Sequence, residues 1–271
     1  MSAIIEPIGI LGGLGLLFGI GLSMASQVFH VESDPKVDKI RAALPGVNCG
    51  ACGYPGCEGL AVGIADGEAS VTACSVGGSM VAERIASIMG VAAGEVEKQV
   101  AVVLCQGDCE HAEDRYIYHG IEDCRAEDAL AGGSKACTYG CLGCGTCQDV
   151  CDFDAISIVD GIAIIDREKC TGCELCVAIC PKKLIEMVPY EQDVIVKCKS
   201  EEAGRFVRRK CTVGCIGCSI CVKNCPDDAF IFENLLARID YDKCTNCGIC
   251  VEKCPTKSIW SGIEEVEQIA Q

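Results

Sequence analysis

The N-terminal part of the chain is dominated by one apolar segment. Residues 7–29 carry no Asp, Glu, Lys or Arg, and residues 8–22 are almost wholly Gly, Leu and Ile. A helix needs about 20 apolar residues to span a membrane. A cleaved signal peptide has a basic region before its apolar stretch, and residues 1–6 contain no Lys or Arg. The pattern therefore predicts a retained transmembrane anchor rather than a cleaved signal or a buried core helix.

The residues that flank this segment predict its orientation. No basic residue precedes it, whereas Lys36, Lys39 and Arg41 follow it. The positive-inside rule then places the N-terminus outside and the chain after about residue 31 in the cytoplasm. We therefore expect a single-pass protein of the cell (inner) membrane whose remaining domains are cytoplasmic, in a compartment that keeps thiols reduced.

Shorter apolar patterns predict packing elements in the rest of the chain. Residues 31–48 indicate a linker and a short helix, and the spacing of apolar residues over 79–89 is that of an amphipathic helix. Residues 100–104 predict a buried strand. Two apolar stretches at 153–156 and 162–165 flank Asp160 and Gly161, a pair typical of β-hairpin turns.

An internal repeat with an offset of 74 residues determines the predicted architecture. Ten cysteines, together with Asp166, Lys169 and Pro181, recur in register. The first copy contains Cys124, Cys137, Cys141, Cys144, Cys147, Cys151, Cys170, Cys173, Cys176 and Cys180, and the second Cys198, Cys211, Cys215, Cys218, Cys221, Cys225, Cys244, Cys247, Cys250 and Cys254. Because so many cysteines match, we interpret the region as a duplicated module.

Each copy holds two strings with the spacing C-x2-C-x2-C-x3-C. In two-cluster ferredoxins such a string supplies three thiolates to one iron-sulfur cube, and its last Cys binds the other cube. Zinc sites favour separated Cys pairs and often use His, which argues against zinc. The predicted ligand sets are Cys141, Cys144, Cys147 and Cys180; Cys170, Cys173, Cys176 and Cys151; Cys215, Cys218, Cys221 and Cys254; and Cys244, Cys247, Cys250 and Cys225.

Each copy resembles the bacterial-ferredoxin module, in which two short hairpins and two short helices surround two cubes. One position departs from the pattern, because Asp152 follows Cys151 where the other three strings end in Cys-Pro. The missing Pro should loosen that turn without removing a ligand.

A fifth cluster motif lies upstream of the repeat. Cys49, Cys52 and Cys57 are interleaved with glycines that allow the backbone to wrap closely around a bulky group, and Cys74 follows after sixteen residues. We predict a 4Fe-4S cluster here, with zinc binding or a redox-active Cys pair as the alternatives.

Composition and charge exclude other classes of protein. With 26 Cys in 271 residues the chain is cysteine-rich, yet it is much longer than small disulfide scaffolds, and its cysteines are clustered in CxxC strings. The net charge of −16 disfavours nucleic-acid binding. No constellation of Ser, His and carboxylates suggests a catalytic site, and His30, His111 and His119 are scattered.

The order of these motifs resembles the B-type subunits of the Rnf complexes, the membrane-bound, ion-translocating ferredoxin:NAD+ oxidoreductases. A C-x2-C-x4-C-x16-C motif directly after one N-terminal membrane helix, followed by ferredoxin strings, carries this resemblance over essentially the whole chain. It looks like the long form with two ferredoxin modules. The resemblance implies an electron-transfer subunit that accepts electrons from reduced soluble ferredoxin and relays them to other Rnf subunits, which bind NAD+ and flavin. The predicted translocase thus has no complete active site on this chain.

The expected fold class is α+β, with an N-terminal transmembrane helix, a small helical Fe-S domain and two tandem two-cluster ferredoxin-like modules. The predicted boundaries are 1–30 for the anchor, 31–99 for the N-terminal cluster domain, 100–136 for a Cys-containing connector, 137–190 for the first module, 191–210 for a second connector and 211–271 for the second module.

Six cysteines lie outside the five predicted sets. One hypothesis is a sixth cluster on Cys105, Cys109, Cys124 and Cys137. Another is a bridging site formed by the duplicated pairs Cys124/Cys137 and Cys198/Cys211. The third is that all six are reduced thiols or alternates for neighbouring ligands.

Two rival functions remain at this level. The chain could be a polyferredoxin-like wire of another membrane oxidoreductase such as a hydrogenase, or a zinc scaffold that binds partners. The acidic chain also needs a basic patch to dock an acidic ferredoxin, and Arg205, Arg208, Arg209 and Lys210 form the densest candidate. The coupling ion and the direction of electron flow are not encoded in these motifs.

Overall fold

The N-terminal helix α1 comprises Ser2–Val28. The computed structural model describes residues 2–28, 34–94 and 97–261, and within α1 the side chains of residues 11–26. Leu11, Leu17 and Leu22 each expose at least 70% of their surface. The transmembrane anchor predicted for residues 7–29 falls within α1 except for its last residue, which lies outside the described residues. Within them, no helix combines the length and the apolar character that a membrane crossing requires.

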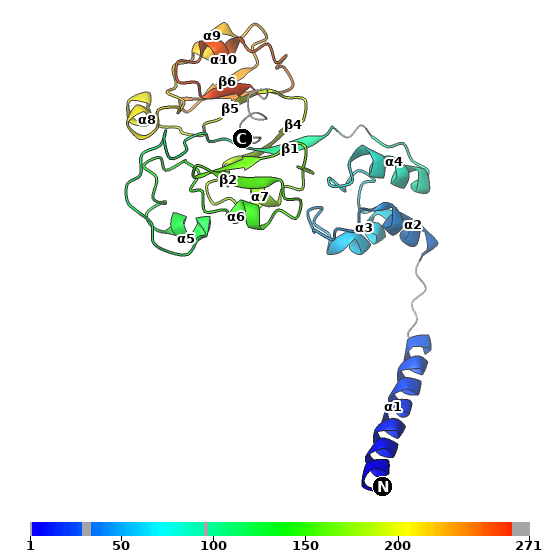
Figure 1. Cartoon of the computed structure of the whole chain (residues 1–271). Helices are drawn as coiled ribbons and strands as arrows, with labels where there is room; N and C mark the ends of the chain where they lie inside the picture. The colour runs from blue at the N-terminus through cyan, green and yellow to red at the C-terminus, as the bar shows by residue number, and fades with distance from the viewer. Residues whose placement is uncertain (1, 29–33, 95–96, 262–271) are drawn as a thin grey trace.

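Three helices form a small N-terminal domain (Figure 1). They are α2 (Pro35–Ala43), α3 (Gly56–Ala65) and α4 (Gly78–Met89), which confirms the helices expected in 31–48 and 79–89. Asp34 caps α2, because its carboxylate accepts a hydrogen bond from the Lys36 amide over 2.8 Å. Ile40, Leu60, Ile64 and Ile85 pack together with at most 1% exposure, so the apolar faces of the three helices share one core.

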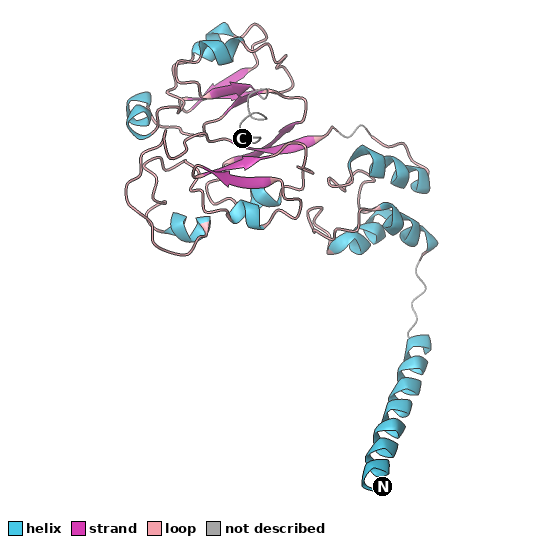
Figure 2. Cartoon of the chain, viewed as in Figure 1, coloured by secondary structure: helices cyan, strands magenta, loops and turns pink. Residues whose placement is uncertain are grey.

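The duplicated region folds into two modules of mixed short helices and strands (Figure 2). Each has the order helix, hairpin, helix, strand. The first module contains α6 (Thr146–Asp149), β2 (Ile156–Val159), β3 (Ile162–Ile165), α7 (Leu175–Ile179) and β4 (Ile185–Pro189). The second contains α9 (Ile220–Asn224), β6 (Phe230–Glu233), β7 (Leu236–Ile239), α10 (Ile249–Lys253) and β8 (Ile259–Ser261).

The hairpin predicted around Asp160 and Gly161 is confirmed. Strands β2 and β3 pair antiparallel, and both turn residues have positive φ, 47° and 77°. Such turns match the twist of the flanking strands. The first strand of the hairpin covers 156–159, whereas the apolar stretch that predicted it covers 153–156. The strand therefore lies closer to the turn than predicted. In the second module the same turn is made by Asn234 and Leu235.

Each module is completed by a strand from the segment that precedes it. Strand β1 (Gln99–Val103) pairs antiparallel with β4, and β5 (Val194–Val196) pairs antiparallel with β8. The segments predicted as connectors therefore supply a strand to each module. They also contain the short helices α5 (Cys124–Ala129) and α8 (Gly204–Lys210).

The strand registers define which residues of the two modules are equivalent. Val103 lies opposite Ile185 and Val196 opposite Ile259, and Ile185 and Ile259 are 74 residues apart. The next hydrogen bonds agree, because the Leu104 amide donates to the Leu184 carbonyl and the Lys197 amide to the Ser258 carbonyl, each over 2.8 Å. Cys105, two residues after Val103, is therefore the structural counterpart of Cys198, two residues after Val196. The match of Cys124 with Cys198 by the 74-residue offset is wrong in the folded chain, because Cys124 begins helix α5 and does not follow the pairing strand.

Candidate metal centres

The four N-terminal cysteines are neighbours in the structure. Cys49 and Cys52 lie on the loop that leads into α3, and Cys57 lies in the first turn of that helix. Gly50, Gly53 and Gly56 all have positive φ. The Asn48 carboxamide oxygen accepts a hydrogen bond from the Cys57 amide over 2.8 Å and fixes this loop. Burial raises the pKa of Cys74, and Cys57, Cys52 and Cys49 raise it further. The structure thus brings together the four residues predicted as one ligand set.

In the first module the predicted set that contains Cys151 is also assembled. Burial raises the pKa of Cys176 to about 12, and Cys170, Cys173 and Cys151 contribute in the same direction. The pKa of Cys173 is likewise raised by burial and then by Cys151, Cys170 and Cys49. Cys49 belongs to the N-terminal set. A Cys49 thiolate thus acts on Cys173 across the boundary between the N-terminal domain and the first module.

In the second module one complete set surrounds a cavity. Cys215, Cys218, Cys221 and Cys254 line a space of about 370 Å³, counting the part open to solvent. Burial raises the pKa of Cys221 to about 12, and the other three thiols raise it further. Cys215, Cys218 and Cys221 thus surround one space, and Cys254, the predicted fourth ligand, reaches the same space from the end of α10.

The corresponding cavity of the first module has a different lining. Cys141, Cys147 and Cys180 line it together with Cys124, and Cys144 is not among the lining residues. The Cys144 thiol instead donates a hydrogen bond to Glu127 over 2.8 Å. Cys144 also lies beside Cys124, and the interaction of the two thiols lowers the pKa of Cys124. The structure therefore gathers three of the four predicted ligands and adds Cys124.

The last set is gathered in part. Burial raises the pKa of Cys250 to about 11, and Cys244 and Cys247 raise it further. Cys225, predicted as the fourth ligand, is not among the groups that act on Cys250. Its sulfur accepts a hydrogen bond from the Ala229 amide over 3.4 Å.

Several observations test whether these residues fit iron-sulfur clusters. The groups that would bind the metal are all thiols. Backbone amides donate hydrogen bonds to such thiols, as the Ala101 amide does to the Cys170 sulfur over 3.4 Å. Thr171, next to Cys170, has a buried hydroxyl without a partner among the described groups, where an acceptor on a bound cluster would satisfy it. Within the described residues no three Cys, His, Asp or Glu side chains gather closely enough for a single metal ion. The donor set and the orphaned hydroxyl fit the clusters.

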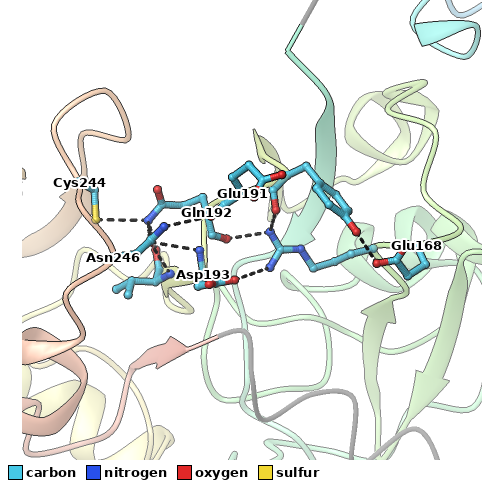
Figure 3. A network of polar contacts seen from close by, with 9 residues as sticks. Glu168, Glu191, Gln192, Asp193, Cys244 and Asn246 are labelled. Atoms are coloured by element: carbon cyan, nitrogen blue, oxygen red, sulfur yellow. Dashed lines mark hydrogen bonds and ion pairs between the residues drawn. The ribbon is translucent and has the colours of Figure 1, made fainter. Parts of the chain in front are cut away.

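A polar network joins the two modules at Cys244 (Figure 3). The Gln192 side-chain amide, 4% exposed, donates to the Cys244 sulfur over 3.3 Å and to the Asn246 oxygen over 2.6 Å. On the other side Arg167 donates to the Gln192 carbonyl over 2.8 Å. Nothing in the sequence motifs pointed to Gln192, because the contact is made by a loop residue 52 positions away from Cys244.

The six remaining cysteines separate into three groups. Cys105, Cys137, Cys198 and Cys211 line one cavity. Cys124 lies beside Cys144, and Cys109 is exposed at the β2–β3 turn, where its amide donates to the Asp160 carbonyl over 2.9 Å. Neither predicted grouping of these cysteines is thus the one that the structure gathers. The sequence did contain a sign that Cys105 and Cys198 are equivalent, because each of them follows an apolar strand.

Four family models match the chain. A model described as "Putative Fe-S cluster" covers residues 44–76, and two described as 4Fe-4S dicluster domains cover residues 140–184 and 169–230. A 4Fe-4S binding domain covers residues 237–260. These matches fall on the N-terminal motif and on both modules, so the chain carries multiple 4Fe-4S clusters.

Curated relatives match over most of their length. The B-type subunit of the Na(+)-translocating ferredoxin:NAD(+) oxidoreductase complex of Acetobacterium woodii is 54% identical over 90% of this chain and 74% of the relative. The B-type subunit of the ion-translocating oxidoreductase complex of Methanosarcina acetivorans is 42% identical over 90% of this chain and 92% of the relative. The counterpart from the proton-translocating ferredoxin:NAD(+) oxidoreductase complex of Clostridium ljungdahlii is 41% identical over 90% and 87%.

Proposed function

Because the chain belongs to the family of B-type subunits of the ion-translocating ferredoxin:NAD+ oxidoreductase (Rnf) complexes, we propose that it takes electrons from reduced ferredoxin and relays them to the other subunits. It is the iron-sulfur subunit of this multisubunit, membrane-bound complex. Iron-sulfur clusters supply one-electron carriers whose potentials the protein adjusts. The chain's own task is to hold them at fixed, neighbouring positions.

The adjacency of the cysteine sets carries this proposal. Cys49 of the N-terminal set acts on the pKa of Cys173 in the first module. Across the module boundary, Gln192 connects the loop after β4 with Cys244 of the second module. Five four-cysteine sets, the twenty predicted from the strings and from the N-terminal motif, would hold five clusters along this series. No flavin or NAD+ site is part of the proposal for this chain.

Helix α8 is the proposed docking surface for ferredoxin. Arg205, Arg208 and Arg209 are exposed on it, and the Arg205 guanidinium lies 4.7 Å from the centre of the Phe206 ring. Phe206 exposes 43% of its surface. Lys210 is different, because its ammonium group contacts both carboxylate oxygens of Glu202 at 2.6 and 2.8 Å. The docking patch is therefore reduced from four basic residues to the three arginines.

Helix α1 is the part that we propose to hold the chain at the membrane, with the cluster domains on the cytoplasmic side. The support is its row of exposed apolar side chains, among them Leu14, Phe18 and Ile20, each more than half exposed. A helix with apolar residues on all sides is stabilised when lipid or a membrane subunit covers it.

Anaerobic purification of the complex through this subunit tests the proposed relay. Reduced ferredoxin should drive NAD+ reduction by the purified complex. A Cys52→Ser variant, which lacks one thiol of the N-terminal set, should lose most of this activity. Reduced ferredoxin should still reduce the clusters of its modules, seen as bleaching near 400 nm. A complex with full NAD+ reduction in the Cys52→Ser variant would exclude the N-terminal set from the path.

A further inference from the structure

Four cysteines without an assigned ligand role surround one cavity at the junction of the two modules. Cys105 follows β1 and Cys137 lies in the first copy of the repeat, whereas Cys198 follows β5 and Cys211 lies in the second copy. The space encloses about 420 Å³, counting the part open to solvent, compared with about 370 Å³ for the cavity lined by Cys215, Cys218, Cys221 and Cys254. The junction cavity is thus as large as one that presents a complete ferredoxin ligand set.

The four thiols are two pairs of equivalent residues. Cys137 and Cys211 are equivalent by the 74-residue repeat. Cys105 and Cys198 are equivalent by strand register, since each lies two residues beyond a valine that faces Ile185 or Ile259. Each module therefore presents the same two thiols to the shared cavity. The sequence offset concealed this, because 32 positions separate Cys105 from Cys137 and only 13 separate Cys198 from Cys211.

Backbone amides lie close to all four sulfurs of the cavity. The amide of Cys141 donates to the Cys105 sulfur over 3.4 Å. The amide of Cys215, the repeat equivalent of Cys141, acts on Cys198 and lowers its pKa, although burial of the Cys198 thiol raises that pKa more.

For Cys137 and Cys211 the nearby amide lies two residues further along the chain. It is that of Tyr139 for Cys137 and that of Val213 for Cys211, and each lowers the pKa of its thiol, although burial raises that pKa more. Amide hydrogen bonds to sulfur are a general feature of iron-sulfur sites, where they adjust the potential.

Space and charge at the cavity also suit an anionic cluster. Gly107 leaves room beside two of the sulfurs, because a Cβ atom there would lie 3.2 Å from the Cys211 sulfur and 3.9 Å from that of Cys105. Lys135, 5% exposed, is held at the cavity wall by hydrogen bonds from its ammonium group to the Gly107 and Gly161 carbonyls over 2.7 and 3.0 Å. A buried positive charge next to four thiolates offsets part of their repulsion.

We propose that Cys105, Cys137, Cys198 and Cys211 bind a sixth cluster of four irons, shared by the two modules. The site does not depend on the proposed electron relay, since it concerns metal binding alone. It replaces both groupings that the sequence suggested. Cys109 and Cys124 remain outside it.

Metal analysis of the full-length chain, reconstituted anaerobically with iron and sulfide, tests the site. The wild type should hold about 24 Fe and about 24 acid-labile sulfides per chain, four of each for six clusters. The double variant Cys105→Ser/Cys198→Ser removes one thiol from each module and should hold about 20 of each. Cys109→Ser, with an exposed thiol outside the cavity, is the matched control and should stay at about 24.

Three results would overturn the proposal. A wild type with about 20 Fe and no other metal would leave the four residues as plain thiols, and one with about 20 Fe and one Zn would make the junction a zinc site. A loss of about four Fe in Cys109→Ser would support a different ligand set.

A second variant keeps every thiol in place. Gly107→Val puts carbon atoms next to the sulfurs of Cys105 and Cys211, and it should lower the iron content by about four per chain. If the double Ser variant fails to fold, this variant and the wild-type iron and zinc contents still decide the question. Because no ferredoxin or NAD+ is used, failure here leaves the proposed relay unaffected.

Discussion

The side-chain amide of Gln192 donates a hydrogen bond to the sulfur of Cys244 over 3.3 Å, from a position that is 4% exposed. The equivalent cysteine of the first module, Cys170, receives its bond from the backbone amide of Ala101. The two modules therefore use different hydrogen-bond donors for equivalent cysteine sulfurs. Only the side-chain donor, Gln192 in the second module, can be removed by a substitution.

Replacing Gln192 with Leu should lower the reduction potential of the cluster bound by Cys244. The hydrogen bond that the variant lacks stabilises the reduced cluster, which is more negative than the oxidised one. A bond that favours the reduced over the oxidised cluster by about 0.5–1.5 kcal/mol corresponds to about 20–60 mV for one electron. Redox titration followed by EPR measures the shift. Gln99→Leu is the matched control, because Gln99 is exposed on β1 at the equivalent position. Equal potentials in Gln192→Leu and the wild type would show that the bond has no influence.

The roles of Cys124 and Cys144 can be separated by metal content. Cys144 belongs to the four-cysteine string, while Cys124 lines the cavity with Cys141, Cys147 and Cys180. We expect Cys144→Ser to lose about four Fe per chain and Cys124→Ser to keep the wild-type content. The opposite pattern would make Cys124 the ligand, in agreement with the hydrogen bond that Cys144 donates to Glu127.

Gly143 should be far less tolerant of substitution than Gly248, although both lie within cysteine strings and have positive φ, 76° and 74°. A Cβ atom at Gly143 would lie 2.5 Å from the Gly161 carbonyl oxygen, whereas one at Gly248 meets nothing within 4 Å. Gly248→Ala should cost about 1–2 kcal/mol from backbone strain alone. Gly143→Ala should cost about 2–4 kcal/mol, because overpacking adds to the strain. Thermal unfolding of the reconstituted chains measures both, and equal losses would contradict the close approach.

The arginines of α8 should determine ferredoxin affinity. Changing Arg205, Arg208 and Arg209 together to Gln should raise the KM for ferredoxin about 3- to 150-fold at low salt, since exposed ion pairs contribute about 0.2–1 kcal/mol each. The effect should shrink as salt screens the charges. Lys210→Gln should leave the KM unchanged, because Lys210 is paired with Glu202. An unchanged KM in the triple variant would reject docking at α8.

Removing residues 1–28 should release the chain from membranes without changing its iron content. The expected cause is the loss of the exposed apolar side chains of α1. Membrane flotation and iron analysis of the same preparation measure both properties. A truncated chain that still floats with the membrane fraction would show that other surfaces of the complex hold it there.

The duplication, the string spacing and hence the iron-sulfur chemistry were predictable from the amino-acid order alone. These features depend on local geometry, because three thiolates within seven residues are brought close by a single turn, as in the cavity lined by Cys215, Cys218 and Cys221. The hairpin at Asp160 and Gly161 was predictable for the same reason, since two residues with positive φ define it.

Which distant residues meet could be learned only from the folded chain. Strand pairing, rather than the spacing of cysteines, makes Cys105 the counterpart of Cys198. The longer segment between Cys105 and Cys137 contains α5, which carries Cys124 away from the junction and places it beside Cys144. Inter-strand hydrogen bonds fix residue partners regardless of the length of chain between them, so no linear spacing of cysteines records that pairing.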